Sequence, residues 1–302
     1  MKKFLFHILL FFAVIGAVDT FVGLAGDYLQ RNAKGGKTGQ FNNLVMKDNH
    51  DILVLGSSRA LHHYDTPFLS DTLGMDVYNA GFKGNGVVLA CGILELVLKH
   101  SHPKLIVFDI EPAFDIYTYE DDDNHKRYLY NLKPYYRIPE IGDIFKDISR
   151  EDWLAVHSGM VRHNTSIITK TVDNLVASSK DSAGFEPLAG TLLSETKAVI
   201  DPDREIDTLK IRYVERLIGI ARAKEIPVLF IASPKYGCTD SSELDPLKGI
   251  CLENQVPFLD YYSSQEFNSH REWFQEATHL NATGARIFSS IICGDINSVL
   301  QI

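Results

Sequence analysis

Cysteines and basic clusters are both scarce in this chain. Four cysteines in 302 residues are too few for the disulfide framework that holds many small secreted domains together. The 39 acidic residues outnumber the 30 basic ones, giving a net charge of −9, whereas phosphate backbones are bound by clustered Lys and Arg. We therefore expect no nucleic acid partner. An apolar share of 45% and a charged share of 23% exclude a disordered, collagen-like or coiled-coil chain.

Spacings typical of metal and phosphate sites are missing as well. The histidines of His62-His63 and of His100-Ser-His102 have no Cys or carboxylate cluster beside them at ligand spacing, so we expect no metal site. The glycine-rich segment Gly81–Gly86 lacks the Gly-Lys-Ser/Thr ending of a phosphate loop and the spacing of a dinucleotide fingerprint. We accordingly expect no cofactor.

The amino terminus, residues 1–26, is strongly apolar. Two lysines precede an apolar run from Phe4 to Val18, and a second apolar stretch comes after Asp19. This order is typical of export signals. A cleaved signal peptide, an uncleaved signal anchor and a buried core helix are the three interpretations. The core helix is the least favoured, because apolar residues surround the whole helix instead of forming one stripe.

Between the other two interpretations we favour the anchor, because the apolar residues continue past any small-residue cleavage site. The run from Phe4 to Val18 alone is short for a span, which takes roughly 17–25 residues; counted through Ala25 it is long enough. We expect the basic tail inside and the rest of the chain exported, to the periplasm or the cell surface, with the membrane as a partner.

Export makes a disulfide chemically possible. Cys238 and Cys251 flank a polar segment and are the candidate pair, with two free thiols as an equally good alternative. Cys91 and Cys293 lie in apolar helical patterns and are expected in the core.

Residues 27–50 are polar and glycine-containing and are expected to form a linker. Residues 51–302 then alternate short apolar runs with helical patterns, which predicts an α/β domain: a three-layer α/β/α sandwich around a mostly parallel sheet. Strands are predicted at 51–55, 76–79, 104–110, 226–232 and 257–260, and helices at 86–100, 207–224 and 282–300.

The alternation breaks at about 113–205, a range rich in tyrosine that also holds the acidic run 120–123. We expect a helical insertion between the third and fourth strands. An insertion beyond the carboxyl ends of strands can cover a ligand site. Its aromatic residues either contact a substrate or, as is more common, pack the insertion onto the domain.

Two polar segments lie at the ends of predicted elements. Ser57 and Ser58 follow Gly56 directly after the first strand, where a helix amino terminus can supply N–H donors. His279 comes three residues after Glu276, in a turn before the last helix. At this spacing the carboxylate can hold one ring nitrogen and leave the other to take a proton. A serine hydroxyl needs such a base to become a nucleophile.

Each segment alone has a structural explanation, because Gly-Ser-Ser is common in turns and His279 can cap a helix. Their occurrence together, at the first strand and the last helix of one α/β domain, favours a catalytic pair. Arg59 directly follows Ser58 and either binds an anionic substrate or forms a salt bridge with Asp109 or Glu111.

The order and context of these segments resemble the SGNH/GDSL hydrolase superfamily, in particular its exported bacterial branch with a Gly-Ser-Ser-Arg first block. Gly56–Ser58 matches the first block, with Ser57 in place of the family's Asp. Asn79–Gly81 matches the second block, and Glu276–His279 matches the last, with Glu in place of Asp. The resemblance covers most of residues 51–302 in order, and its specific motifs amount to only about a dozen positions.

This resemblance implies an SGNH/flavodoxin-like fold and a Ser-His-Glu triad, with Ser58 as nucleophile, His279 as base and Glu276 as acid. It also implies that the N–H groups of Ser58 and Gly81 bind the oxyanion. The family's third block has no match after the third strand, and Asn85 is our substitute for its side-chain donor.

The activity implied is that of a serine esterase that removes O-acyl groups from a carbohydrate. The alternatives are an O-acyltransferase for surface polysaccharide and a non-catalytic glycan-binding or assembly protein on a degenerate SGNH scaffold.

Overall fold

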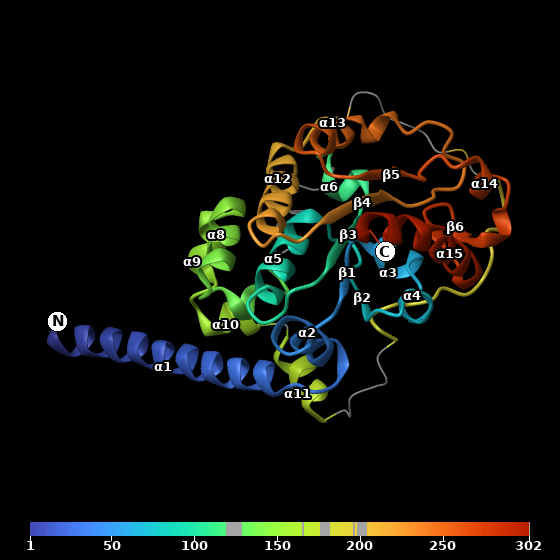
Figure 1. Cartoon of the computed structure of the whole chain (residues 1–302). Helices are drawn as coiled ribbons and strands as arrows, with labels where there is room; N and C mark the ends of the chain where they lie inside the picture. Colours follow the sequence, from blue (N-terminus) through green and yellow to red (C-terminus); the bar gives the residue numbers. More distant parts are fainter. Residues whose placement is uncertain (119–128, 165, 176–181, 196, 198–203, 302) are drawn as a thin grey trace. The chain divides into compact units, whose positions relative to one another are not determined.

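The computed structural model of this chain describes residues 1–118, 129–164, 166–175, 182–195, 197 and 204–301. The chain divides into two compact units (Figure 1): unit 1 comprises residues 1–47 and 125–181, and unit 2 comprises residues 48–124 and 182–302.

Unit 2 contains a five-stranded parallel sheet with the strand order β2-β1-β3-β4-β5. The strands are β1 (Ile52–Gly56), β2 (Val77–Gly81), β3 (Leu105–Asp109), β4 (Val228–Ala232) and β5 (Phe258–Asp260). Every residue of the first four strands is buried, as expected of a parallel sheet with both faces covered. The predicted α/β class is confirmed, and each predicted strand is present.

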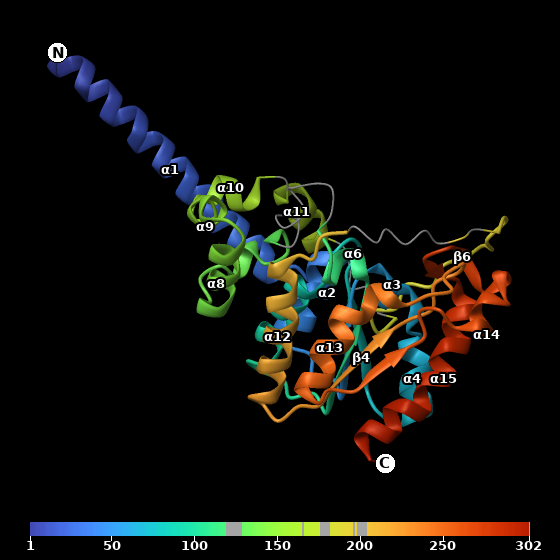
Figure 2. The same ribbon diagram turned by 90° about the horizontal axis from the view of Figure 1, so that it is seen from above.

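Helices lie on both sides of this sheet (Figure 2). On one side α5 (Val87–Val97) packs against α12 (Thr208–Arg222). On the other side α3 (Ser58–His63), α4 (Thr66–Leu73) and α15 (Ala282–Leu300) pack together. The helix predicted at 207–224 is present as α12; its apolar face is buried, and the Asp207 side chain caps its first turn.

Short elements complete unit 2. They are α6 (Pro112–Asp115), η2 (Ser242–Leu244), α13 (Asp245–Asn254), α14 (Gln265–Asn268), η3 (Arg271–Trp273) and the antiparallel pair β6 (Phe274–Glu276) and β7 (His279–Leu280). All four cysteines are buried free thiols. The Cys238–Cys251 disulfide is therefore absent, and the Cys238 Sγ instead lies 3.0 Å from the carbonyl oxygen of Asp240.

Unit 1 is helical. Its elements are α1 (Lys2–Asn32), α2 (Gly36–Met46), η1 (Lys133–Tyr135), α8 (Pro139–Ile148), α9 (Arg150–Ala155), α10 (Gly159–His163) and α11 (Ile167–Leu175). Within the described part of the chain, α1 alone is long and apolar enough to cross a membrane. The large side chains of its first half are exposed, which agrees with a signal or anchor and not with a buried core helix.

The expectation of a linker at 27–50 is wrong. Helix α1 continues to Asn32, and α2 begins only four residues later, at Gly36. Although this range is polar in overall composition, α2 has an apolar face, and its residues Phe41, Leu44 and Val45 are buried. A hydrogen bond of 3.0 Å from Gln30 to Asn42 joins the two helices.

The expected insertion at 113–205 is helical only in part. Residues 125–181 group with residues 1–47 in unit 1, and that part carries η1 and α8 to α11. The described residues 182–195 belong to unit 2 and contain no helix or strand. The acidic run at 120–123 falls outside the described residues.

Candidate active site

The turn from β1 into α3 places Ser58 at the carboxyl edge of the sheet. Gly56 ends β1 with φ +142°, a backbone conformation that favours glycine. A Cβ atom on Gly56 would lie 2.6 Å from the carbonyl oxygen of Asp109. The Ser57 Oγ caps α3 by accepting a hydrogen bond of 3.2 Å from the Arg59 N–H. In sheets of this strand order, ligands bind at the switch point between β1 and β3, which is where Ser58 lies.

Three side chains predicted from the sequence come together at this edge. The Ser58 Oγ lies 2.8 Å from the His279 Nε2, although the two residues are 221 positions apart. The Glu276 carboxylate is hydrogen-bonded to the His279 Nδ1. This arrangement puts the ring proton on Nδ1 and leaves Nε2 to accept the Ser58 proton. The pair β6–β7 supplies both the Glu and the His.

Two of the expected oxyanion donors, Gly81 and Asn85, already make a hydrogen bond within the chain. The Gly81 N–H already donates a hydrogen bond of 3.0 Å to the Asn79 Oδ1. Asn79 in turn donates to the carbonyl oxygen of Ala60 at 2.7 Å. Asn85 is 9% exposed, and its Nδ2 donates to the carbonyl oxygen of Lys83 at 2.9 Å. The Gly81 N–H is therefore occupied by the Asn79 side chain, which also links β2 to α3.

Replacing Gly81 by alanine is expected to lower the free energy of unfolding by about 1–3 kcal/mol, because the added methyl overpacks a tight contact. Its Cβ would lie 2.6 Å from the Leu61 backbone nitrogen in α3. Urea denaturation of the full chain, followed by circular dichroism, measures the change. Gly219→Ala in α12 is the matched control, since a Cβ there meets nothing within 4 Å and is expected to be neutral or stabilising. Equal midpoints for the two variants would contradict this account.

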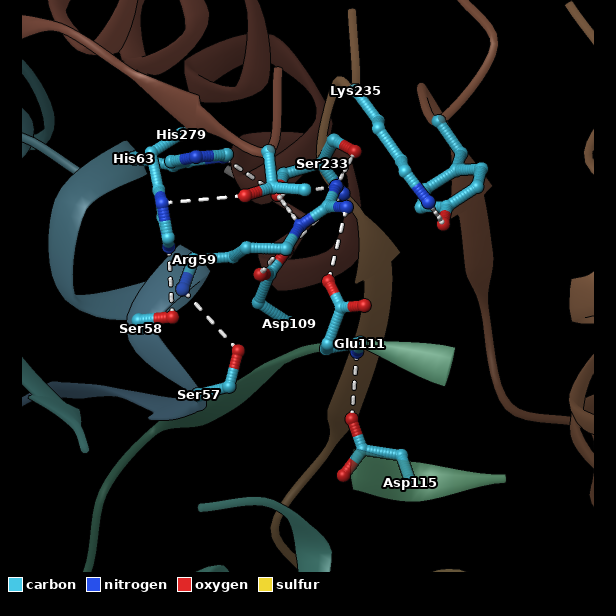
Figure 3. A network of polar contacts seen from close by, with 12 residues as sticks. Ser57, Ser58, Arg59, His63, Asp109, Glu111, Asp115, Ser233, Lys235 and His279 are labelled. Carbon is cyan, nitrogen blue, oxygen red and sulfur yellow. Dashed lines mark hydrogen bonds and ion pairs between the residues drawn. The ribbon is translucent and has the colours of Figure 1, made fainter. Parts of the chain in front are cut away.

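Beside Ser58 lies a buried polar network around Arg59, which the motifs indicate only in part (Figure 3). Arg59 is 1% exposed, which excludes the alternative that it binds an anionic substrate. Its guanidinium lies 3.2 Å from Glu111 and 4.0 Å from Asp109. It also donates to the Ser233 carbonyl and, at 3.1 Å, to the Ser233 Oγ. The salt-bridge alternative for Arg59 is thus correct.

His63 connects this network to the strand that carries His279. Its Nε2 accepts a hydrogen bond of 3.0 Å from the Leu280 N–H, which leaves the ring proton on Nδ1. That nitrogen lies 2.8 Å from the Ser233 Oγ. Burial and the nearby Arg59 charge lower the pKa of His63 well below its usual value, so the ring is neutral. No motif indicated these roles of His63 and Ser233, because the contact forms only when α3 meets the end of β4.

Asp109 accepts two hydrogen bonds with the same carboxylate oxygen, from the Tyr64 hydroxyl at 2.9 Å and the Ser233 N–H at 3.1 Å. Its other oxygen is buried without a hydrogen bond. Burial raises the pKa of Asp109 to about 6, although the Arg59 charge acts in the opposite direction. The network therefore holds a carboxyl group that titrates close to neutrality.

Among the described residues, no group of three or more His, Cys, Asp or Glu side chains is placed to hold a metal ion. Comparison with known proteins found no matching family model and no matching curated protein.

Proposed function

We propose that this chain is a serine esterase that removes O-acyl groups from a carbohydrate outside the cytoplasm, on an SGNH-like three-layer α/β/α sandwich. The observation that carries the proposal is the distance of 2.8 Å between the Ser58 Oγ and the His279 Nε2, with Glu276 on the opposite ring nitrogen. The sequence resemblance supports the reaction class, and the apolar helix α1 supports export.

The reaction begins when the His279 Nε2 takes the Ser58 proton as the Oγ attacks the acyl carbonyl carbon. The tetrahedral intermediate then collapses, and the leaving sugar oxygen takes the proton from His279. Water then attacks the acyl carbon of the resulting acyl-enzyme and gives its proton to His279. The bond between the acyl carbon and the Ser58 Oγ breaks, the carboxylic acid leaves, and the Oγ takes the proton from His279. Attack by a sugar hydroxyl instead of water would make the same site an O-acyltransferase.

The intermediate's oxyanion needs donors that are aimed at it. We assign this role to the Ser58 N–H, at the start of α3, and to Asn85, whose Nδ2 has a second N–H besides the one bound to Lys83. Gly81 is not assigned, because its N–H is held by Asn79. One missing donor costs roughly 3 kcal/mol of transition-state stabilisation.

A non-catalytic glycan-binding or assembly protein is the second candidate. The occupied Gly81 N–H and the unmatched third block favour it. This candidate predicts glycan binding without turnover of any acyl ester.

Treatment of the full chain with a fluorophosphonate probe tests the proposal. We expect one adduct per chain, mapped by mass spectrometry to the peptide that contains Ser58, and hydrolysis of p-nitrophenyl acetate and acetylated xylan. Product that forms only with an added sugar acceptor would identify a transferase. Absence of both adduct and turnover, with retained glycan binding, would leave the second candidate.

A further inference from the structure

Unit 1 is built around the second half of α1. The Asp19 carboxylate accepts hydrogen bonds from the backbone N–H groups of Gly159 and Met160, at 3.0 and 2.9 Å, where α10 begins. A Cβ on Gly159 would lie 2.4 Å from the Gly23 Cα, so α1 and α10 touch through their backbones. A Cβ on Gly26 would lie 2.3 Å from the His163 ring. Such close approach is possible only because glycines occupy these positions.

One turn further along, α1 supplies the carboxylate for a buried cationic cluster. Asp27 lies 3.2 Å from the Arg162 Nε and 2.9 Å from the His163 Nε2. The Lys170 Nζ lies 2.8 Å from the other nitrogen of His163, and burial lowers the pKa of Lys170 to about 8. Arg162 and Lys170 are each 5% exposed. Removing α1 would take away the Asp27 carboxylate, and an uncompensated buried charge is strongly destabilising.

The first half of α1 has the opposite character. The 15 residues from Phe4 to Val18 span only about 22 Å at the helical rise, less than the roughly 30 Å of a bilayer's hydrocarbon core. Phe21, Leu24 and Tyr28 are 71%, 67% and 67% exposed, and they extend this apolar surface along one face of the second half. Tyr28 ends it with the kind of residue that lies at membrane interfaces.

We propose that α1 is retained as a membrane anchor: Lys2–Val18 and the exposed face of Phe21, Leu24 and Tyr28 contact lipid, and the opposite face of Asp19–Asn32 is a permanent part of unit 1. Cleavage after export would remove both the backbone contact with α10 and the carboxylate that faces Arg162 and His163. These contacts support the anchor that the sequence already favours over a cleaved signal peptide.

The test uses the full chain with a C-terminal tag, expressed in a bacterial host. We expect the intact mass of the chain to include residues 1–32. We also expect the chain to stay in the membrane fraction after carbonate extraction. Gly26→Ala is expected to make unit 1 at least tenfold more sensitive to limited proteolysis in detergent. Gly16→Ala is the matched control on the same helix, because a Cβ there meets nothing within 4 Å.

A mature chain that begins within or after α1 would overturn the proposal. So would equal protease sensitivity of Gly26→Ala and Gly16→Ala, because a cleaved signal peptide leaves neither substitution in the mature protein.

A second inference comes from unit 2 and rests on the proposed function. His63 lies on α3 with Ser58, and its Nε2 holds the N–H of Leu280, the residue after His279. The rings of His63 and His279 contact edge-on, with centroids 6.2 Å apart. We infer that His63 is a positioning residue, which holds the base on β7 at the right distance from the nucleophile on α3. A displacement of about 1 Å in such a pair can cost 100-fold in rate.

Two polar variants separate the two bonds of His63. In His63→Gln the amide oxygen can replace Nε2 as acceptor for Leu280, whereas in His63→Asn the amide can replace only the bond of Nδ1 to Ser233. We expect kcat of His63→Asn to fall 10- to 100-fold with KM unchanged, and His63→Gln to stay within about threefold of the wild type.

Hydrogen exchange of the Leu280 amide tests the bond without reference to turnover. We expect exchange at least tenfold faster in His63→Asn and wild-type protection in His63→Gln. Equal exchange, or equal kcat, in the two variants would overturn the positioning role. If the exchange pattern holds while the wild type hydrolyses no ester, the proposed function fails and the structural link remains.

Discussion

Replacing Ser58 by alanine is expected to lower kcat for p-nitrophenyl acetate by 10⁴- to 10⁶-fold, the order seen when a triad serine is removed, and to abolish fluorophosphonate labelling. The physical reason is the loss of the oxygen atom that the His279 Nε2 can activate at 2.8 Å. The variant is expected to keep its fold, because Ser57 and not Ser58 caps α3.

Ser290→Ala is the matched control for this prediction. Ser290 is an exposed serine on α15 whose Oγ bonds within its own helix, so labelling and turnover are expected to match those of the wild type. Circular dichroism of both variants confirms that each is folded. Labelling of Ser58→Ala at the wild-type rate would show that another residue is the nucleophile and would refute the triad.

The sheet and the contacts among Ser58, His279 and Glu276 could be predicted because both leave local signals in the sequence. Buried parallel strands are continuous apolar runs, and the Gly56 turn marks where the first one stops. Glu276 and His279 are three residues apart, so their contact depends on one turn alone. Their meeting with Ser58 follows from the sheet topology, since a strand end and the last helix of an α/β domain converge at one edge.

The features that could not be predicted depend on contacts between distant segments. The polar composition of 27–50 suggested a linker, yet Phe41 and its neighbours in α2 are buried. Gly81 is a different case, because the Asn79 side chain that accepts from its N–H lies only two residues away in β2, and the motif does not give the orientation of that side chain. His63 and Ser233 are 170 residues apart and have no motif.

Arg59→Met is expected to lower the free energy of unfolding by about 3–5 kcal/mol at pH 8, the range for breaking a buried ion pair. Methionine keeps much of the side-chain volume but leaves the Asp109 carboxylate without its cation. It also removes the donors to Glu111 and to the Ser233 carbonyl. Urea denaturation of the full chain measures the loss. Lys104→Met is the control, because its ion pair on the surface is largely exposed and is worth at most about 1 kcal/mol.

The cost of Arg59→Met is also expected to depend on pH. Burial raises the pKa of Asp109 to about 6, while Arg59 acts to lower it, so the variant's Asp109 pKa lies higher still. When the pKa of a carboxyl is raised in the folded state, the free energy of unfolding falls as the pH rises toward that folded pKa. In the wild type this decrease in unfolding free energy ends near pH 6, the Asp109 pKa. In the variant it continues to higher pH, because the Asp109 pKa is higher. The deficit should therefore be smaller at pH 5 than at pH 8. A deficit independent of pH would mean that Arg59 stabilises the fold through Glu111 and Ser233 and not through Asp109.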